Sequence, residues 1–210
     1  MMMMMMNGWL EMTTKGQEQQ MPLSNGNFEL AEDSSEPDVM INDDSDFPVN
    51  YTTSLNPTGI ADWRVIQNGV QLLTNNVYLP APSDPLSLCC LHLNMPGYDN
   101  TSQGAIQTIL NFIPALDVLY NVTFDMARDP DADFNEANIS MQHSVYMNGQ
   151  LVDQGIHVPI FNITDTPSYI SWSTEMFTIV GLSVLTTLEF ESLSINYGCL
   201  IDNVKIFQIS

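Results

Sequence analysis

Basic residues are scarce in this sequence of 210 residues. Four Lys and Arg stand against 25 Asp and Glu, which gives a formal net charge of −21. Nucleic acids and anionic membranes are bound through basic patches, so this imbalance argues against both as partners. The same excess of acid fits a well-solvated surface or the binding of divalent cations.

Long apolar runs are also missing. The longest weakly polar run, MFTIVGLSVLTTL, is too short to span a bilayer and contains Thr and Ser throughout. The N-terminus begins with six Met and lacks the basic start, apolar centre and small-residue cleavage site of a signal peptide. We therefore expect no membrane span, and either the protein is not exported by that route or its true start differs.

Cysteine is represented by only three residues, Cys89, Cys90 and Cys199. Adjacent cysteines rarely bridge each other, so at most one disulfide can form, from Cys199 to Cys89 or to Cys90. The favoured interpretation is that all three are buried thiols that pack as small hydrophobic side chains.

Catalytic motifs are absent as well. His92, His143 and His157 do not have the spacing of zinc ligands, and the sequence contains no nucleophile elbow and no glycine-rich phosphate loop. Asp and Glu are so abundant that a pair of carboxylates carries no information. We therefore predict a protein that is not an enzyme.

Strand-like alternation is what the sequence does contain, from Ala61 onward. In YNVTFDMA, one face carries Tyr120, Val122, Phe124 and Met126. Asn148-Gly149 lies between two extended runs, which is the strongest short hairpin signal. Other expected strands are DWRVIQ, GVQLLT, LSLCCLHLN, GAIQTIL, ISWSTEMFTI, TLEFES and the C-terminal segment. Many short strands without a long amphipathic helix predict an all-β fold, an antiparallel β-sandwich or jelly roll.

The expected domain organisation is a tail followed by one domain. Residues 1–21 are polar and Met-rich without periodicity, and we predict that they are disordered. Residues 22–210 form a single β-sandwich domain, with an acidic loop insertion at about 31–60 that contains several prolines.

Several motifs follow one another in a familiar order: NGNFE, ADWRV, LHLN, GAIQTI, YNVTFDMARDP, SWSTEMFTI, TTLEFES and GCLIDNVKI. Over roughly residues 23–209 the chain resembles galactose-binding-like β-sandwich domains. These include choice-of-anchor C surface proteins, related plant cell-wall proteins and the carbohydrate-binding modules of xylanases and cellulases. The resemblance implies a non-catalytic extracellular or cell-surface module that binds a carbohydrate or cell-wall glycan. A structural or assembly component of a cell surface or coat is the alternative, and a glycan-active hydrolase is the third hypothesis.

The C-terminal segment raises the question of what Asp202 contacts. A strand period of two places Leu200, Asp202, Val204 and Ile206 on one face, so Asp202 is expected to point inward, where a carboxylate needs a partner. The resemblance implies a structural calcium near the first and last strands, with Glu29 and Asp202 as ligands. The alternative is that backbone N–H groups of the first strand donate to Asp202.

A second calcium candidate lies in RDPDADFNEANIS, where Asp129, Asp131, Asp133 and Asn135 alternate like the start of a calcium-binding loop. The segment departs from that pattern at its glycine and final glutamate positions. A solvated acidic loop is the favoured interpretation.

A glycan site is expected in the loops rather than in the core. Tyr78 and Tyr98 lie in loop-like segments, and the hydrogen-bonding side chains near Tyr98 are Asp99, Asn100 and Gln103. Trp63 and Trp172 fall within strand motifs, and we expect both in the core.

Overall fold

The computed structural model describes the residues that make up most of the sandwich. The described ranges are 19–21, 26, 28, 30–33, 36–40, 49–52, 60–74, 89–94, 103–109, 112–129, 139–160, 170–194 and 197–209. All regular elements within them are strands, as the sequence predicts. No helix in these ranges is long and apolar enough to cross a membrane.

Fourteen strands are present in the described ranges. In chain order they are β1 (Gln19–Met21), β2 (Leu30–Asp33), β3 (Glu36–Met40), β4 (Val49–Thr52), β5 (Trp63–Gln67), β6 (Gly69–Thr74), β7 (Cys89–His92), β8 (Ala105–Thr108), β9 (Leu119–Arg128), β10 (Met141–Met147), β11 (Gln150–His157), β12 (Ser173–Val180), β13 (Thr186–Ser192) and β14 (Cys199–Ile209).

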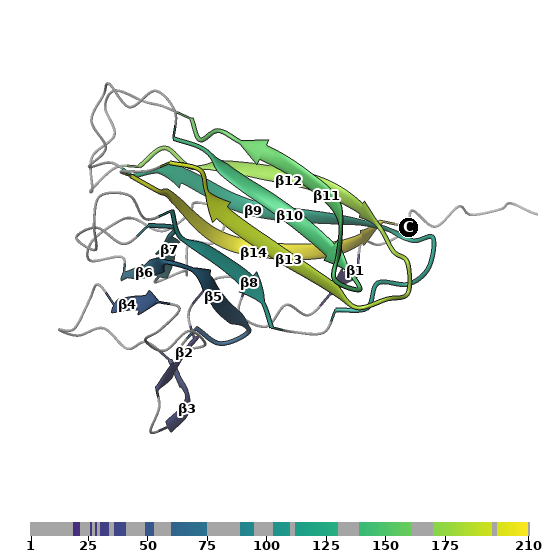
Figure 1. Cartoon of the computed structure of the whole chain (residues 1–210), viewed down its shortest axis with the longest axis horizontal. Coiled ribbons are helices and arrows are strands. Elements are labelled where there is room, and N and C mark those ends of the chain that lie inside the picture. The colour runs from purple at the N-terminus through teal and green to yellow at the C-terminus, as the bar shows by residue number, and fades with distance from the viewer. Residues whose placement is uncertain are drawn as a thin grey trace, which may run out of the picture.

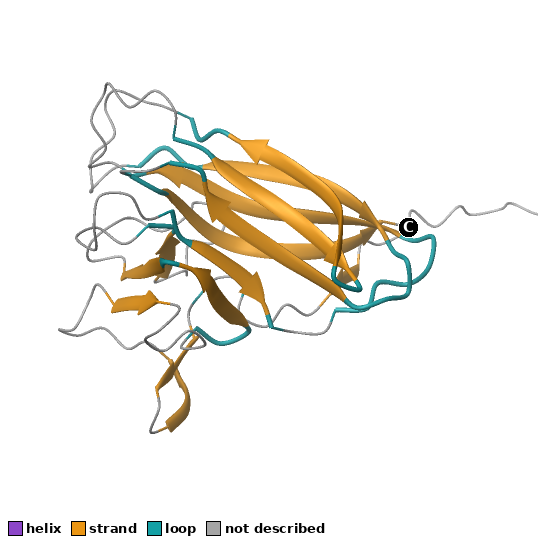
Figure 2. Ribbon diagram, viewed as in Figure 1, coloured by secondary structure: helices purple, strands orange, loops and turns teal. Residues whose placement is uncertain are grey.

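The strands form two main antiparallel sheets that lie one over the other (Figures 1 and 2). The seven-stranded sheet has the order β12-β9-β14-β7-β6-β4, with β1 also paired to β14. The five-stranded sheet has the order β11-β10-β13-β8-β5, and β2 and β3 form a separate hairpin. This is the antiparallel β-sandwich predicted from the alternating pattern.

The main core lies between the two sheets. The seven-stranded sheet contributes Tyr120, Val122, Phe124 and Met126 of β9, all fully buried as the alternation predicts. Trp63, in β5 of the opposite sheet, is also fully buried. The register of these strands is well specified, because a shift of one residue would move every apolar side chain of a strand to the other face of the sheet.

The predicted hairpin joins β10 to β11. Asn148 and Gly149 both have positive φ angles, of 51° and 76°. Two successive left-handed residues are what a tight two-residue hairpin requires, and Asn and Gly adopt that conformation more easily than other residues.

A β-bulge in β14 corrects the prediction for the C-terminal segment. Asp202 pairs with Asp125 of β9, but Lys205 pairs with Thr123, so β14 contains one extra residue there. Asn203 adopts a left-handed φ of 56° at this point. An extra residue reverses the alternation, so residues two apart in sequence on either side of it no longer point to the same face of the sheet.

The bulge divides β14 between two apolar clusters. Val204 and Ile206 belong to the main core, whereas Leu200 belongs to a second cluster on the outer face of the seven-stranded sheet. The members of this second cluster are Leu73, Cys90, Ala127, Ile170 and Leu200, with Trp172 packed against it. The prediction that Leu200, Asp202, Val204 and Ile206 share one face is therefore wrong, although Asp202 is fully buried.

Two predicted boundaries are also corrected. The last residues of the expected tail, Gln19–Met21, pair with β14 as strand β1. The expected loop insertion contains β2, β3 and β4, and β4 extends the seven-stranded sheet beside β6. Such short strands form through backbone hydrogen bonds to a neighbour, which need no apolar periodicity in the sequence. Residues 1–18 lie outside the described ranges.

Candidate functional site

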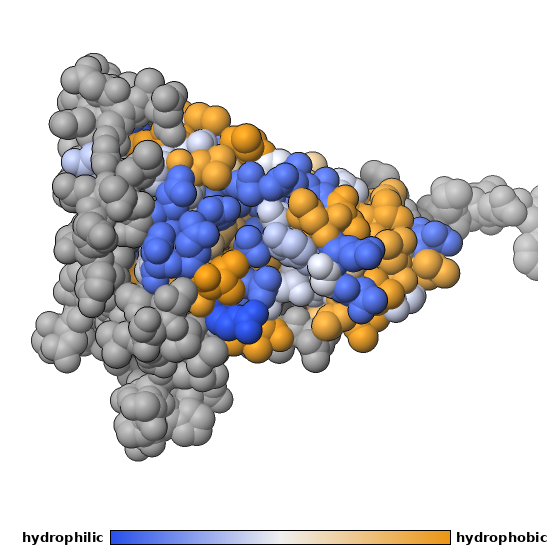
Figure 3. Space-filling view, in the orientation of Figure 1, coloured by the Kyte–Doolittle hydropathy of each residue, from blue (hydrophilic) through white to orange (hydrophobic). Residues whose placement is uncertain are grey.

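Polar side chains form a row across the outer face of the five-stranded sheet. Cross-strand pairing joins Arg64 of β5 to Gln107 of β8, and Gln107 to Glu189 of β13. Glu189 in turn pairs with Ser144 of β10, and Ser144 with Gln154 of β11. We call these five residues the polar row. Hydrophilic residues gather over β8, β10 and β13 in Figure 3.

Hydrogen bonds connect three of the five members of the polar row. The Arg64 guanidinium donates from Nη2 to Gln107 Oε1 over 2.6 Å, and Gln107 Nε2 donates to Glu189 Oε2 over 3.4 Å. One step along the sheet, Gln67 Nε2 donates to Glu191 Oε1 over 3.1 Å. These contacts hold a guanidinium, two amides and two carboxylates on one surface, where they offer both donors and acceptors.

Burial, followed by like charge, raises the proton affinity of two side chains on this surface. Burial, and then the charge of Glu191, raises the pKa of Glu189, and the hydrogen bond from Gln107 opposes this in part. Burial, followed by the charge of Glu189, raises the pKa of Tyr146, the aromatic residue beside the row. Tyr146 therefore keeps its phenolic proton near neutral pH and remains a donor.

The Glu189→Gln variant is expected to be slightly more stable than the wild type at pH 7. A carboxyl whose pKa is raised by folding destabilises the native state once pH rises above its ordinary value of 4.5, because the native state disfavours ionisation. Relief of one like-charge contact stabilises by roughly 0.5 kcal/mol, or about 1–2 °C in the thermal midpoint of a chain of this size. The difference should shrink towards pH 4, as measured by thermal scans at both pH values. A gain of equal size at pH 4 and pH 7 would contradict the charge-based explanation.

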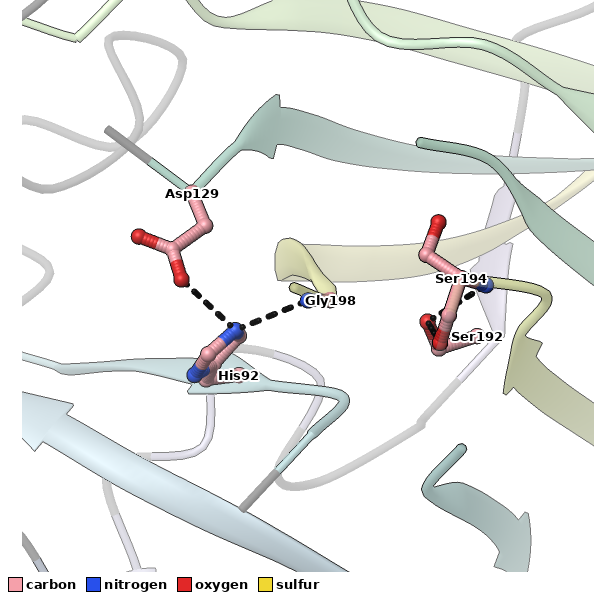
Figure 4. Close-up of polar contacts among 5 residues, drawn as sticks. All are labelled: His92, Asp129, Ser192, Ser194 and Gly198. Carbon is pink, nitrogen blue, oxygen red and sulfur yellow. Dashed lines mark hydrogen bonds and ion pairs between the residues drawn. The ribbon is translucent and has the colours of Figure 1, made fainter. Parts of the chain in front are cut away.

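A buried histidine and aspartate lie on the other sheet, at the end of β9 (Figure 4). His92 Nε2 is 3.3 Å from Asp129 Oδ2, and the Gly198 backbone N–H donates to the same nitrogen over 3.3 Å. Both side chains are almost fully buried. The contacts tie β7 to the end of β9 and the start of β14.

This pair does not form a serine nucleophile site with the two nearby serines. Ser192 and Ser194 are buried and hydrogen-bond to each other, the Ser194 backbone N–H donating to Ser192 Oγ over 3.3 Å. In Figure 4 their side chains lie away from the His92 ring. A hydroxyl is activated only when a base lies within hydrogen-bonding reach, so this arrangement gives no support to a hydrolase.

Asp202 lies opposite a second carboxylate that the sequence did not single out. Asp202 of β14 pairs directly with Asp125 of β9, and both residues are buried. The Asn203 backbone N–H donates to Asp202 Oδ1 over 2.6 Å, while Asn203 Nδ2 donates to Asp125 Oδ2 over 3.1 Å. Thr174 Oγ1 also donates to Asp125. Only the strand register reveals this pairing, because the two residues are far apart in sequence.

One described residue of the NGNFE segment, Gly26, contacts β14 at the bulge that follows Asp202. The Val204 backbone N–H donates to the Gly26 carbonyl over 2.8 Å, which places Gly26 next to the bulge. Glu29 itself lies outside the described residues. Among the described residues, no group of three or more His, Cys, Asp or Glu side chains is arranged to hold a metal ion.

The remaining predicted site residues divide into described and undescribed ones. Gln103 donates from Nε2 to the Leu193 carbonyl over 2.8 Å, so its amide holds two segments together. The predicted residues outside the described ranges are Tyr78, Tyr98, Asp99, Asn100, Asp131, Asp133 and Asn135. Sequence reasoning missed the polar row because its members come from five strands and show no motif.

The three cysteines are free and buried, in agreement with the favoured interpretation. Burial, and to a smaller extent the charge of Asp129, raises the pKa of Cys199 far above its ordinary value. A thiol that does not ionise is a poor nucleophile, so Cys199 is a packing residue.

Comparison with known proteins shows the fold but no family. No protein-family model matches the chain, and no curated protein matches it in sequence. A cyclase from Fischerella sp. TAU is similar in structure, with a TM-score of 0.57 and 12% identity over 92% of this chain and 98% of the cyclase. An arabinose-bound α-L-arabinofuranosidase gives a TM-score of 0.50 and 10% identity over 72% of this chain, which spans only 24% of that enzyme.

A carbohydrate-binding module in complex with β-1,4-galactotriose gives a lower TM-score of 0.47, with 14% identity over 71% of this chain and 90% of the module. At such identities the cyclase and the arabinofuranosidase, with TM-scores of 0.57 and 0.50, support the β-sandwich and show nothing about its activity.

Proposed function

We propose that this chain is a non-catalytic carbohydrate-binding module of the cell surface or extracellular space, and that it binds glycan on the outer face of the five-stranded sheet. The polar row carries the proposal. Sugar hydroxyls are both donors and acceptors, and a glycan site needs a few such groups held in fixed positions. Arg64, Gln107 and Glu189 are fixed in this way by their mutual hydrogen bonds.

An aromatic ring beside polar groups also supports sugar binding. Tyr146 lies on the same face as the polar row and is only partly buried. Aromatic rings pack against the apolar face of a pyranose while neighbouring side chains bind its hydroxyls. The arabinofuranosidase, of which this chain covers only 24%, was solved with bound arabinose, and the cyclase represents the enzymatic alternative.

The proposal is tested by glycan binding with matched variants. The double variant Arg64→Ala/Gln107→Ala should bind at least tenfold more weakly on a glycan array and in affinity electrophoresis, because each lost hydrogen bond contributes roughly 1 kcal/mol. Thr178→Ala is the control, since Thr178 is exposed on the other sheet and its hydroxyl donates to Asn121 Oδ1, away from the polar row. All variants should keep the wild-type thermal midpoint within about 2 °C.

The same experiment separates the sheet face from the loops. Loss of binding in Tyr98→Ala with full binding in the double variant would place the glycan site in the loops predicted from sequence. Failure of the wild-type chain to bind any glycan would overturn the proposed function.

We further propose that a structural calcium stabilises the module next to the bulge of β14. Calcium takes six to eight oxygen ligands, and carboxylates with backbone carbonyls are its usual donors. Asp202 and Asp125 supply two adjacent buried carboxylates that fit this chemistry, and the Gly26 backbone lies at the same bulge. When bound, the ion would neutralise two like charges in a region of low dielectric.

A structural or assembly role is the second candidate, and one surface favours it. One end of the sandwich carries exposed aliphatic side chains, visible at the right of Figure 3. Backbone hydrogen bonds join residues 112–118 to residues 181–186, and the exposed aliphatic residues in and next to these segments are Ile113, Leu116, Leu119, Val180, Leu182 and Leu185. Contiguous apolar surface often marks a contact with another molecule. Sedimentation analysis over a range of concentrations would reveal self-association through this end. If the chain is a monomer at all concentrations, self-assembly is excluded and the binding module is the remaining proposal.

A further inference from the structure

Two of the three histidines face each other at one edge of the sandwich. His143 Nδ1 of β10 is 2.7 Å from His157 Nε2 of β11. The other nitrogen of His143, Nε2, is 3.1 Å from Asp153 Oδ2, and the other nitrogen of His157, Nδ1, is 3.4 Å from Glu175 Oε2. We call these four side chains the histidine bridge.

The histidine bridge connects the two sheets. Asp153 and His157 belong to β11, the edge strand of the five-stranded sheet, and Glu175 belongs to β12, the edge strand of the seven-stranded sheet. The His143 and His157 side chains are only 5% and 10% exposed, whereas those of Asp153 and Glu175 are 43% and 31% exposed. Two buried imidazoles therefore lie between two carboxylates that reach solvent.

Counting protons shows that two neutral rings do not satisfy these contacts. Each of the three contacts is a hydrogen bond and needs one proton between its two atoms. A neutral imidazole carries one proton, and an ionised carboxylate carries none. If both rings are neutral and donate to their carboxylates, two lone pairs face each other across 2.7 Å. The bridge therefore needs a third proton, which lies between His143 Nδ1 and His157 Nε2.

The short distance between the rings fits a proton rather than a metal ion. Zinc lies about 2.0–2.1 Å from each imidazole nitrogen, so at a tetrahedral angle two ligating nitrogens are more than about 3 Å apart. A separation of 2.7 Å is within the range of an N–H···N hydrogen bond.

The surroundings hold the His143 ring in place. The ring stacks on Phe177 of β12 with centroids 3.7 Å apart and planes only 2° from parallel. On its neighbouring strand, a Cβ added to Gly155 would lie 2.6 Å from His143 Cε1, so only glycine leaves room for the ring. The face of an aromatic ring also attracts a cation, which favours a protonated imidazole here.

Among the described residues, Asp153 and Glu175 are the titratable groups that contact the two rings. β9 contributes Phe124, which meets the His157 ring edge-on at 4.9 Å. β13 contributes Phe190, directly across from His143. The carboxylates of Glu189 and Glu191, on the same strand, lie on the opposite face of the sheet.

We propose that the histidine bridge holds a single shared proton at neutral pH and acts as a pH-sensitive latch between edge strands β11 and β12. A second proton at acid pH removes the acceptor from the N–H···N bond and places two imidazolium ions side by side. Loss of the shared proton at alkaline pH leaves two lone pairs in contact. Only the intermediate protonation state keeps the latch closed.

The electrostatics of His143 resist the second proton. Burial lowers the pKa of His143 below its ordinary 6.5, and the positive charge of His157 lowers it further, while the hydrogen bond to Asp153 acts in the opposite direction. Below pH 6.5 the unfolded chain takes up a proton on each of these histidines, but the native bridge holds only one. Stability is then lost as pH falls, by up to tenfold in the folding constant per pH unit.

The alkaline side has the opposite sign. Well above the ordinary histidine pKa of 6.5 the unfolded histidines are neutral, whereas a bridge that keeps its shared proton carries one proton more than the unfolded chain. Stability is therefore also lost as pH rises, again by up to tenfold in the folding constant per pH unit, until that proton dissociates. The contribution of the bridge should be largest near neutral pH.

The shared proton can be observed directly in the wild-type chain. With only three histidines, a chain labelled with ¹⁵N-histidine gives six ring nitrogen signals. At pH 7 the signals of His143 Nδ1 and His157 Nε2 should lie between those of protonated and unprotonated nitrogens, and a one-bond coupling should link each to the same far-downfield proton. Two ordinary unprotonated signals, with no such proton, would overturn the proposal.

Unfolding measurements from pH 5 to pH 9 provide the second test. The stability of the wild type relative to His143→Gln/His157→Gln should pass through a maximum near neutral pH and fall on both sides. A constant difference would show that the histidines only pack, and would overturn the latch. If the double variant does not fold, Asp153→Asn provides the comparison, because it leaves both rings in place. Asp153 raises the pKa of His143, so without this carboxylate the second proton enters the native bridge at lower pH and the acid-side fall should extend to lower pH. An unchanged acid limb in Asp153→Asn would also count against the latch.

Discussion

Replacing Trp63 with alanine is expected to lower the free energy of unfolding by about 4 kcal/mol. Trp63 is fully buried, and its ring lies between those of Phe28, 5.4 Å away, and Phe190, 6.1 Å away. The variant loses the transfer free energy of a large side chain and leaves a cavity that two rigid neighbouring rings cannot fill. A loss of this size lowers the thermal midpoint by about 8–16 °C in a chain of this length.

Trp172 provides the matched comparison. It is only partly buried and packs against the small second cluster, so Trp172→Ala should cost roughly half as much. Both free energies are measured by equilibrium denaturation, with equal m-values as evidence that the unfolded states are comparable. Equal losses for the two variants would show that the second cluster contributes as much as the main core, contrary to the burial of the two side chains.

Saturating calcium is expected to raise the thermal midpoint of the wild-type chain by about 5–10 °C. An ion that binds only the native state at 100 times its Kd stabilises by about 2.7 kcal/mol, which corresponds to this shift for a chain of about 200 residues. The expectation follows from the paired burial of Asp202 and Asp125. Asp202→Asn keeps the shape of the side chain but removes its charge, so it should abolish the response.

Two controls make the calcium test specific. Asp117→Asn removes an exposed carboxylate from a loop and should leave the shift intact. Magnesium at the same concentration should produce a much smaller shift, because it requires a compact octahedral site. If calcium leaves the wild-type midpoint unchanged, the donors of Asn203 and Thr174 satisfy these carboxylates without a metal ion, and the calcium proposal fails.

Strand positions were predictable from the sequence because alternation is a local property. GVQLLT coincides with β6, and the YNVTFDMA segment lies within β9 with its apolar residues in the core as predicted. The Asn148-Gly149 turn was equally clear, since a tight hairpin requires left-handed residues at both positions.

Cross-strand relationships were not predictable, because register depends on contacts between distant segments. Nothing in the sequence near Arg64 indicates that Gln107 and Glu189 lie beside it. The bulge at Asn203 is a related failure: one extra residue changes the phase of a strand without disturbing its apolar composition. Part of the predicted site, including Tyr98 and Glu29, lies outside the described residues, so those hypotheses stay predictions.

The adjacent thiols of β7 provide intrinsic probes of how the sandwich opens. Cys89 belongs to the main core and Cys90 to the second cluster, so neighbouring residues of one strand sample opposite sides of a sheet. A buried thiol reacts with an alkylating reagent only while its surroundings are open, and its modification rate therefore reports a local opening free energy. Mass mapping of the two modified cysteines would follow the loosening of each layer separately, without any introduced label.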